Sequence, residues 1–159
     1  MNSGFAVAVV VATAAFTGCG PSVDVAKSVK VASVSTGWNA VGTGAGNNKV
    51  VPLASLTLKN VSNQALPLLQ VNAVFHRRGD NAEWGSAFVT AAGSAGLRPG
   101  AEAHVTVRSQ LGYTGVDPSD ALLANSHFVD ATVDVFARVG STEWAHVGEF
   151  PIERQLLRP

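Results

Sequence analysis

A strict alternation of apolar and more polar residues near the C-terminal end limits the fold more than any other feature of the chain. The apolar members recur every second residue and are Val129, Ala131, Val133, Val135, Ala137 and Val139. Between them lie Asp130, Thr132, Asp134 and Arg138, together with the aromatic Phe136. A period of two places alternate side chains on opposite faces of an extended strand. The segment from His127 to Val139 is therefore predicted to be a strand with one face in a hydrophobic core.

Six further segments are rich in Val, Thr, Phe and Leu and are bounded by Gly, Pro, Asn or Asp, which is the pattern of strands separated by turns. They are Val29 to Trp38, Val50 to Asn60, Leu66 to Arg77, Gly85 to Thr90, Ala101 to Gln110 and Thr142 to Pro151. No part of the sequence shows a long helical period. We therefore predict an all-β fold, an immunoglobulin-like antiparallel β-sandwich of about seven strands.

The connections carry recognisable turn signals. Pro99 and Gly100 fit the two central positions of a type II turn, in which Gly supplies the positive φ. Asp117 followed by Pro118 is typical of a helix start, with Asp117 as the N-cap. This predicts one short helix, from Pro118 to Ala124, between the fifth and sixth strands.

The last hairpin allows a prediction of register. Gly140 and Ser141 fit a two-residue loop, which would pair Ala137 with Trp144 and Val135 with His146. Trp144 and His146 would then face inward, and a large Trp opposite a small Ala would pack well in a core. We expect Trp144 to be mostly buried, because only a loop of odd length would turn it outward.

The N-terminus indicates where the protein resides. An uncharged apolar run from Phe5 to Phe16 leads into Thr17-Gly18-Cys19-Gly20. The run is too short for the roughly 20 residues that span a bilayer, but it has the length of a secretory signal core. The alternative is an ordinary buried strand or helix with Cys19 as a core thiol.

The small residues before Cys19 resemble a bacterial lipobox. The resemblance implies that residues 1–18 are a removed signal peptide and that Cys19 carries the lipid. The small and polar residues up to Ser28 suit a tether, so we expect residues 19–28 to be the lipidated Cys with its tether and residues 29–159 to be the β-sandwich domain. Several acyl chains on one Cys hold a protein firmly at a membrane surface. Gly20, where Asp would favour retention in the inner membrane, implies by the same resemblance the periplasmic face of the outer membrane.

Composition excludes some classes of partner and site. The chain has eleven acidic and eleven basic residues and no net charge, so a row of nucleic-acid phosphates is not an expected partner. Cys19 is the only Cys, so a lipid on it leaves no thiol for a disulfide or a thiolate metal site.

Three segments carry a second resemblance: Leu58 to Leu68, Val71 to Asp80, and Leu97-Arg98-Pro99-Gly100. Their Asn-containing turn, apolar strand with an aromatic end and Leu-x-Pro-Gly turn are similar to the FxLYD-like and related immunoglobulin-like domains of bacterial lipoproteins. The resemblance implies a β-sandwich that binds or spaces and does not catalyse.

The histidines give no metal motif. His76, His104, His127 and His146 form no closely spaced pair, although zinc sites normally require three or four nitrogen or sulfur ligands. The single Met disfavours a methionine-rich copper carrier. We therefore assign no metal and no cofactor.

Catalytic patterns are equally weak. Asp130 and Asp134 share a strand face about 13 Å apart, at about 3.3 Å per residue. Glycosidase carboxylates instead lie roughly 5 to 9.5 Å apart. The stretch Gly93-Ser94-Ala95-Gly96 lacks the spacing of a nucleophile elbow. The run Gly42 to Gly46 is not followed by the Lys-Ser/Thr of a phosphate loop. We assign no catalytic residue and do not expect an enzyme.

Two aromatic residues are candidate contacts for a partner protein. Tyr113, the only Tyr, stands between two glycines in a long connection, and Tyr suits interfaces because it offers apolar area with a polar tip. Its alternative is a place over the end of the sandwich with its hydroxyl on a backbone group. Phe136 is the second candidate, because it lies on the polar face of its strand.

The first hypothesis is a lipid-anchored, non-enzymatic envelope protein that acts as an accessory or protein-interaction module. The alternative is a periplasmic lipoprotein that binds a small molecule or a metal, and a lipid-anchored hydrolase is a third. An apolar patch at Tyr113 or Phe136 would favour docking. An apolar pocket of some 300 Å³ or more with converging His or Asp would favour the ligand binder.

Overall fold

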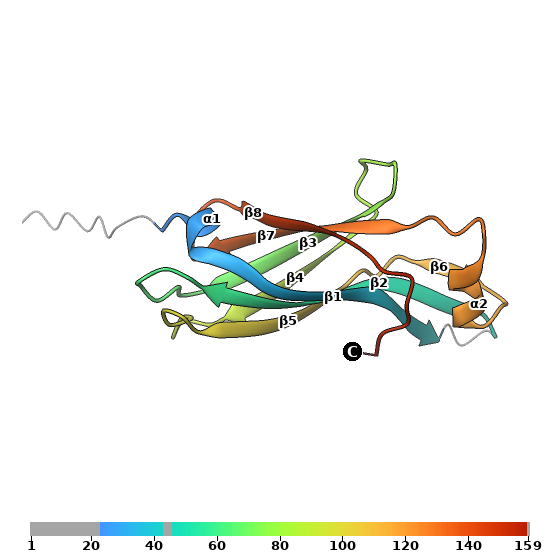
Figure 1. Ribbon diagram of the computed structural model, residues 1–159, viewed down its shortest axis with the longest axis horizontal. Helices are drawn as coiled ribbons and strands as arrows, with labels where there is room; N and C mark the ends of the chain where they lie inside the picture. The colour runs from blue at the N-terminus through green and yellow to red at the C-terminus, as the bar shows by residue number, and fades with distance from the viewer. Residues whose placement is uncertain (1–22, 43–45, 159) are drawn as a thin grey trace, which may run out of the picture.

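Eight strands form two antiparallel sheets that face one another in the computed structural model, which describes residues 23–42 and 46–158 (Figure 1). The first sheet holds β1 (Val29–Gly42), β2 (Asn48–Asn60), β5 (Glu102–Arg108) and β6 (Tyr113–Gly115). The second has the order β4 (Gly85–Ala92), β3 (Leu69–Arg77), β7 (Ala131–Val139), β8 (Ala145–Pro151). Two short helices are α1 (Val25–Ser28) and α2 (Ser119–Ala124). The predicted all-β antiparallel sandwich is confirmed, with eight strands instead of seven and two helices instead of one.

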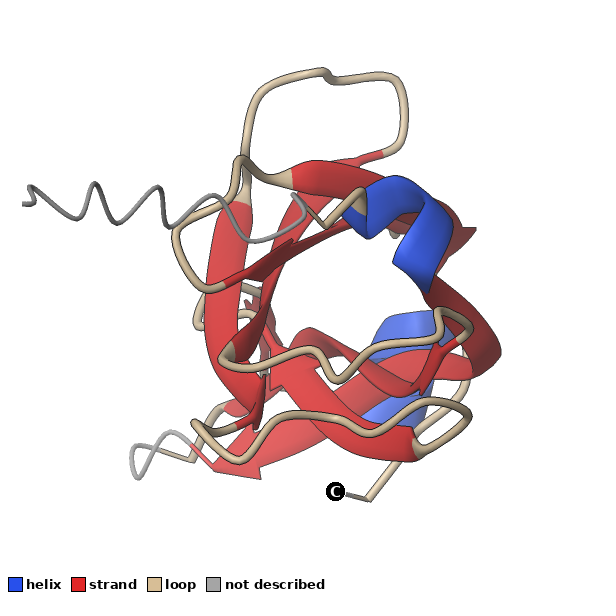
Figure 2. Ribbon diagram, turned by 90° about the vertical axis from the view of Figure 1, so that its left-hand side faces the viewer, coloured by secondary structure: helices blue, strands red, loops and turns tan. Residues whose placement is uncertain are grey.

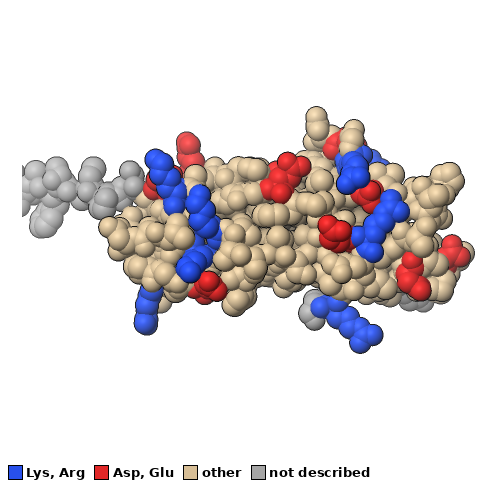
Figure 3. Space-filling view, viewed as in Figure 1, with Lys and Arg blue, Asp and Glu red and all other residues tan. Residues whose placement is uncertain are grey.

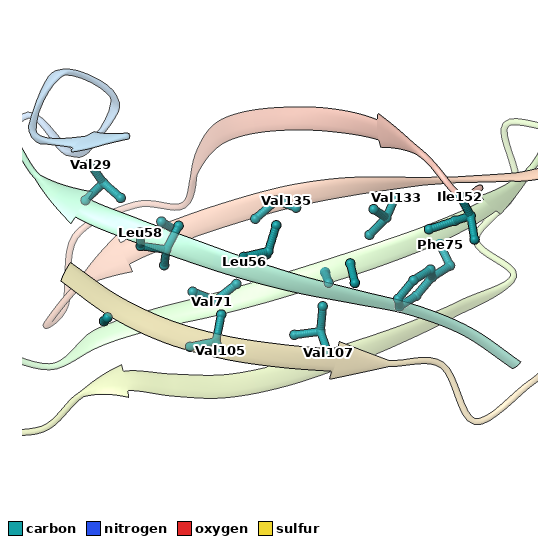
Figure 4. Packing of buried hydrophobic residues seen from close by; sticks show 14 of the residues in the cluster. Val29, Leu56, Leu58, Val71, Phe75, Val105, Val107, Val133, Val135 and Ile152 are labelled. Atoms are coloured by element: carbon teal, nitrogen blue, oxygen red, sulfur yellow. The ribbon is translucent and has the colours of Figure 1, made fainter. Parts of the chain in front are cut away.

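The core lies between the sheets, where the alternation predicted it. Leu56 and Leu58 of β2 point toward Val71, Val133 and Val135 of the second sheet (Figure 4). Seen end-on from the side of α1, the strands surround this common interior (Figure 2). Each aliphatic side chain that is fully buried in this way contributes about 1.5–3 kcal/mol.

The domain begins earlier than predicted. Val25, expected in the tether, lies in α1 and is only 5% exposed, because it packs against the core. The signal-peptide and Cys19 predictions fall outside the described residues. Within the described part, no helix is long and apolar enough to cross a membrane.

The predicted turns are partly confirmed. Gly100 has a φ of 74°, as the type II pattern requires. The helix before β7 runs over Ser119–Ala124, but its N-cap is Pro118 instead of Asp117. The backbone carbonyl of Asp117 instead accepts a hydrogen bond from the Asn48 side chain at 2.9 Å. The helix therefore begins without a side-chain cap.

Pro52 explains why two strands share one edge of β2. The Ser109 N–H donates to the Pro52 carbonyl at 3.0 Å, but Pro52 has no N–H to return. The ladder breaks there, so β5 ends at Arg108 and β6 resumes the edge at Tyr113. In the break, Gly112 passes so close to β2 that a Cβ would overlap the carbonyl oxygen of Val50. Only Gly fits at this position.

The C-terminal segment covers the free edge of β1. The Trp38 N–H donates to the Gln155 carbonyl, and the Leu157 N–H donates to the Trp38 carbonyl, both at 2.8 Å. A Cβ on Gly37 would lie 2.6 Å from the Leu157 side chain, so Gly37 makes room for this segment. Covering an edge strand prevents its unpaired backbone groups from pairing with another chain.

The predicted register of the β7–β8 hairpin is wrong. Ala137 pairs with Ala145, and Phe136 pairs with His146. The Thr142 N–H donates to the Val139 carbonyl at 3.1 Å, as in the predicted two-residue turn, but the Val139 N–H donates to the Thr142 hydroxyl at 3.0 Å instead of a backbone carbonyl. The regular ladder therefore does not continue from the turn, and β8 begins only at Ala145. Trp144 therefore lies outside the ladder and is 37% exposed, and His146 is also exposed.

Candidate functional site

Tyr113 lies at one end of the sandwich and is half-buried. Its ring packs against Phe128, Trp84 and Trp38, with ring centroids 4.7, 5.0 and 5.8 Å away. Its hydroxyl donates to the backbone carbonyl of Val129 at 3.2 Å. Burial raises the pKa of the Tyr113 phenol above its usual value. This geometry is that of the alternative stated above, a Tyr packed over the end of the sandwich.

Phe136 lies on the outer face of the second sheet, as the alternation predicted, and is half-buried. Four outward residues form one row across all four strands of this sheet, in the order Phe88, Asn72, Phe136, His146. The rings of Phe136 and His146 meet edge to face with centroids 5.2 Å apart. Phe136 thus belongs to a row of side chains and does not project alone.

Trp144 and Arg138 form a second layer beside this row. The Arg138 guanidinium lies 4.6 Å above the Trp144 ring, and its Nε donates to Gln70 Oε1 at 2.7 Å. The Trp144 ring also meets Phe88 edge to face, with centroids 6.1 Å apart. Phe88 is 56% exposed. We call Phe88, Phe136, Trp144, Arg138 and His146 the aromatic face.

Asp134 borders the aromatic face at His146, and a second carboxylate, Asp130, lies just before β7. Asp134 accepts a hydrogen bond from His146 Nε2 at 2.7 Å and has His76 Nε2 at 3.4 Å. Asp130 is held by Arg154 at 2.6 Å and by Arg78 at 3.2 Å. Both carboxylates thus have basic partners. In residues 23–42 and 46–158, no group of three or more His, Cys, Asp or Glu is placed to hold a metal ion.

Of the aromatic face, the sequence analysis identified only Phe136 as a contact. It missed Phe88, Trp144, Arg138 and His146, and the wrong register also turned His146 inward. Phe88 lies in a predicted strand, but the sequence did not show which face of that short strand was buried. Trp144 was placed in the core because of the wrong hairpin register. The residue that could have indicated the exposure of Trp144 is Thr142. A Thr hydroxyl next to a turn can accept the hydrogen bond that a backbone carbonyl of the partner strand would otherwise accept.

The distribution of charge agrees with a neutral chain. On the side shown in Figure 3, acidic and basic side chains lie near one another at both ends of the molecule. The histidines at the border of the aromatic face are both next to Asp134. The face therefore combines apolar rings with balanced polar groups at its edge.

Known proteins resemble this chain only weakly. No protein-family model and no curated protein matches the sequence. The X-ray structure of Northeast Structural Genomics Consortium target SoR45 is 17% identical, with a TM-score of 0.42, and covers 80% of this chain and 88% of its own. The solution structure of AT1g01470 from Arabidopsis thaliana is 12% identical, with a TM-score of 0.46 and coverage of 83% of both chains. Likenesses this weak carry no information on function.

Proposed function

We propose that this chain is a lipid-anchored, non-enzymatic accessory protein of the cell envelope that binds another envelope protein through the aromatic face. The observation that carries the proposal is the contiguous group of Phe88, Trp144, Arg138 and Phe136 on one exposed sheet face. The lipobox resemblance at Cys19 supports the anchor and the periplasmic side of the outer membrane. Tyr113 is not part of the proposed contact, because its ring and hydroxyl are used within the domain.

The aromatic face has the composition of a protein interface. Trp and Arg are among the residue types that carry most of the binding energy at interfaces, and they act best at a centre surrounded by polar groups. Here Trp144 contacts both Arg138 and Phe88, and the amide of Gln70 lies beside them. The arrangement suits an apolar patch on a partner.

Arg138 indicates a further chemical feature that the partner should have. Among the described residues, Arg138 donates a hydrogen bond from Nε to Gln70. Its two terminal nitrogens can therefore donate to a carboxylate of the partner. We therefore expect the partner to present an apolar patch that contains an Asp or Glu.

The position of α1 is compatible with an anchored protein. This helix lies at one end of the long axis of the sandwich (Figure 1). The second sheet extends along that axis, so a membrane at the α1 end leaves its outer face accessible from the side.

Site-specific photo-crosslinking in native membranes tests the proposal. A photoreactive Phe analogue replaces Phe88 or Phe136 in the full-length chain, and the control carries it at His104, which is exposed on the first sheet. We expect one discrete adduct with another protein from positions 88 and 136, lost on Arg138→Glu and absent from position 104. The same adduct from position 104, or adducts only between copies of this chain, would overturn the proposal.

The anchor has its own test. Mass spectrometry of the protein isolated from membranes should find a new N-terminus at Cys19 that carries acyl chains. An unmodified Cys19 with residues 1–18 still attached would contradict the anchoring part of the proposal and leave the aromatic face unaffected.

A further inference from the structure

A groove of about 670 Å³ lies beside β4 and β5 and shares Phe88 with the aromatic face. These two strands belong to different sheets and lie side by side (Figure 1). The volume is within the range of small-molecule sites, about 300–1,000 Å³. Seven apolar side chains line it: Val41, Val51, Leu53, Ala87, Phe88, Val89 and Val107.

The apolar lining is unusual in its position. Leu56 and Leu58 of β2 belong to the core cluster between the sheets, and Val51 and Leu53 do not. Alternation instead directs Val51 and Leu53 to the outer face of the first sheet. They are only 2% and 1% exposed, so the protein itself already covers them. The apolar surface that a ligand can reach in the groove belongs to Val41, Ala87, Phe88 and Val89, which are half-buried or exposed. The exposed ring of Phe88 forms an apolar wall on the other side of the groove.

The charged residues of the groove are both cations. Lys49 and Arg108 line it together with Thr106, Ser109 and Gln110, and no acidic residue does, although the chain has as many acids as bases. Within the described ranges, neither Lys49 nor Arg108 takes part in an ion pair, whereas Lys27, Lys59, Arg77, Arg78 and Arg154 each do. The groove is therefore positive and not neutralised by the protein itself.

Each of the two cationic groups donates a hydrogen bond to a neutral oxygen. Arg108 Nη1 donates to Asn39 Oδ1 at 2.9 Å, and Asn39 pairs with Val51. Lys49, two residues from Val51, donates from Nζ to the Gln110 carbonyl at 2.8 Å. Both hydrogen bonds go to neutral oxygens, so an anion that reaches this point would gain charge-assisted hydrogen bonds from two side chains.

We infer that this groove binds a free long-chain fatty acid. The acyl chain lies against the apolar wall formed by Phe88 with Ala87 and Val89, and the carboxylate meets the cations Lys49 and Arg108. The apolar lining and the positive charge together favour a ligand that is apolar along its length and carries one anionic end. The inference goes beyond the proposed function, because the groove shares only Phe88 with the aromatic face and the binding of a fatty acid would stand if the aromatic face bound no partner.

Native mass spectrometry of the full-length chain tests the inference, with oleate as the probe and oleyl alcohol as its neutral equivalent. We expect saturable binding of one oleate per chain and at least tenfold weaker binding of oleyl alcohol. The double variant Lys49→Gln/Arg108→Gln should lose at least tenfold in oleate affinity. The matched control Lys30→Gln/Arg98→Gln removes two exposed cations outside the groove and should bind as the wild type does.

A second variant tests the groove in a different way, in case the double variant loses binding only because it misfolds. Thr106→Trp keeps both cations but fills the groove from an exposed position on β5, so it should also weaken oleate binding. Equal binding of oleate and oleyl alcohol would overturn carboxylate recognition. Oleate binding that is unchanged both in Lys49→Gln/Arg108→Gln and in Thr106→Trp would overturn the site.

Discussion

The Arg154 side chain donates from Nε to Asp130 Oδ1 at 2.6 Å and thereby fixes the C-terminal segment to the residue just before β7. Arg154 Nη2 also donates to the Phe128 carbonyl at 2.9 Å, and its guanidinium lies 5.2 Å above the Phe128 ring. One side chain thus joins the segment that covers β1 to the second sheet and to the aromatic cluster around Tyr113.

Replacing Arg154 should therefore destabilise the fold. Hydrogen bonds to charged groups contribute about 1.5–3 kcal/mol, and partial exposure of Arg154 lowers this value. We predict that Arg154→Ala lowers the free energy of unfolding in urea by about 1–2 kcal/mol. The control Arg98→Ala, at an exposed position in a turn, should change it by less than about 0.5 kcal/mol. Equal effects of the two variants would contradict this role.

Gly112 should be among the least replaceable residues. Because a Cβ there would overlap the Val50 carbonyl, Gly112→Ala must displace β6 from β2. We predict a loss of about 2–4 kcal/mol in the free energy of unfolding. Gly93→Ala is the matched control, because a Cβ at Gly93 meets no atom within 4 Å. If Gly112→Ala were as stable as Gly93→Ala, Gly112 could not lie as close to the Val50 carbonyl of β2 as described here.

Asn60 organises the loops at the opposite end of the sandwich. It is 0% exposed, and its amide nitrogen donates to the carbonyls of Gln64 at 2.7 Å and Leu97 at 2.8 Å. Asn60→Asp would place a carboxylate against these two carbonyls. We predict a loss of about 3 kcal/mol or more at pH 7.

The Asn60→Asp loss should depend on pH in a definite direction. An unfavourable buried carboxylate has a raised pKa in the folded state, so its penalty grows as the pH rises above the unfolded value of about 3.9. Unfolding measured at pH 3.5 should therefore show a smaller difference from wild type than unfolding at pH 7. A difference that does not change with pH would argue against the buried contacts of Asn60.

Tyr113 should make the stability of the fold depend on pH under alkaline conditions. Because burial raises the pKa of its phenol, the neutral form is favoured in the folded state. Its contribution to stability is complete below pH 10 and is lost as the pH rises through the folded pKa. The stability difference between wild type and Tyr113→Phe should stay constant up to about pH 9 and shrink as the pH rises above about 10. At neutral pH, Tyr113→Phe should cost about 1 kcal/mol for the bond to Val129.

An absorbance titration provides an independent measurement of the same group. The chain has a single Tyr, so the signal belongs to Tyr113 alone. The folded protein should titrate at a higher pH than the chain in denaturant. Identical titration curves would show that the phenol is not buried.

Local patterns in the sequence predicted most of the fold. The alternation over β7 and the turn at Pro99-Gly100 depend on neighbouring residues alone, and the structure has both. The hairpin register could not be predicted in the same way, because it depends on the Thr142 hydroxyl replacing a backbone acceptor. The C-terminal segment was also missed, since Gln155 and Leu157 pair with Trp38, which is far away in sequence.

The candidate site was predicted only in part. Phe136 was found because its place on the polar face of a strand follows from alternation. Trp144 and Phe88 required the true register and the order of the strands, which bring Trp144, next to β8, into contact with β4 at the opposite edge of the sheet. The groove beside β4 and β5 could not be predicted, because its lining comes from strands of both sheets.

The most direct test of the central claim measures how strongly the crosslinked partner binds the full-length chain, in wild type and in Trp144→Ala. Val34→Ala, at another exposed apolar position, is the control. Loss of a central Trp at an interface costs about 2 kcal/mol or more, so the dissociation constant should rise about thirtyfold for Trp144→Ala and stay unchanged for Val34→Ala. A partner that binds Trp144→Ala as tightly as wild type would contradict binding through the aromatic face.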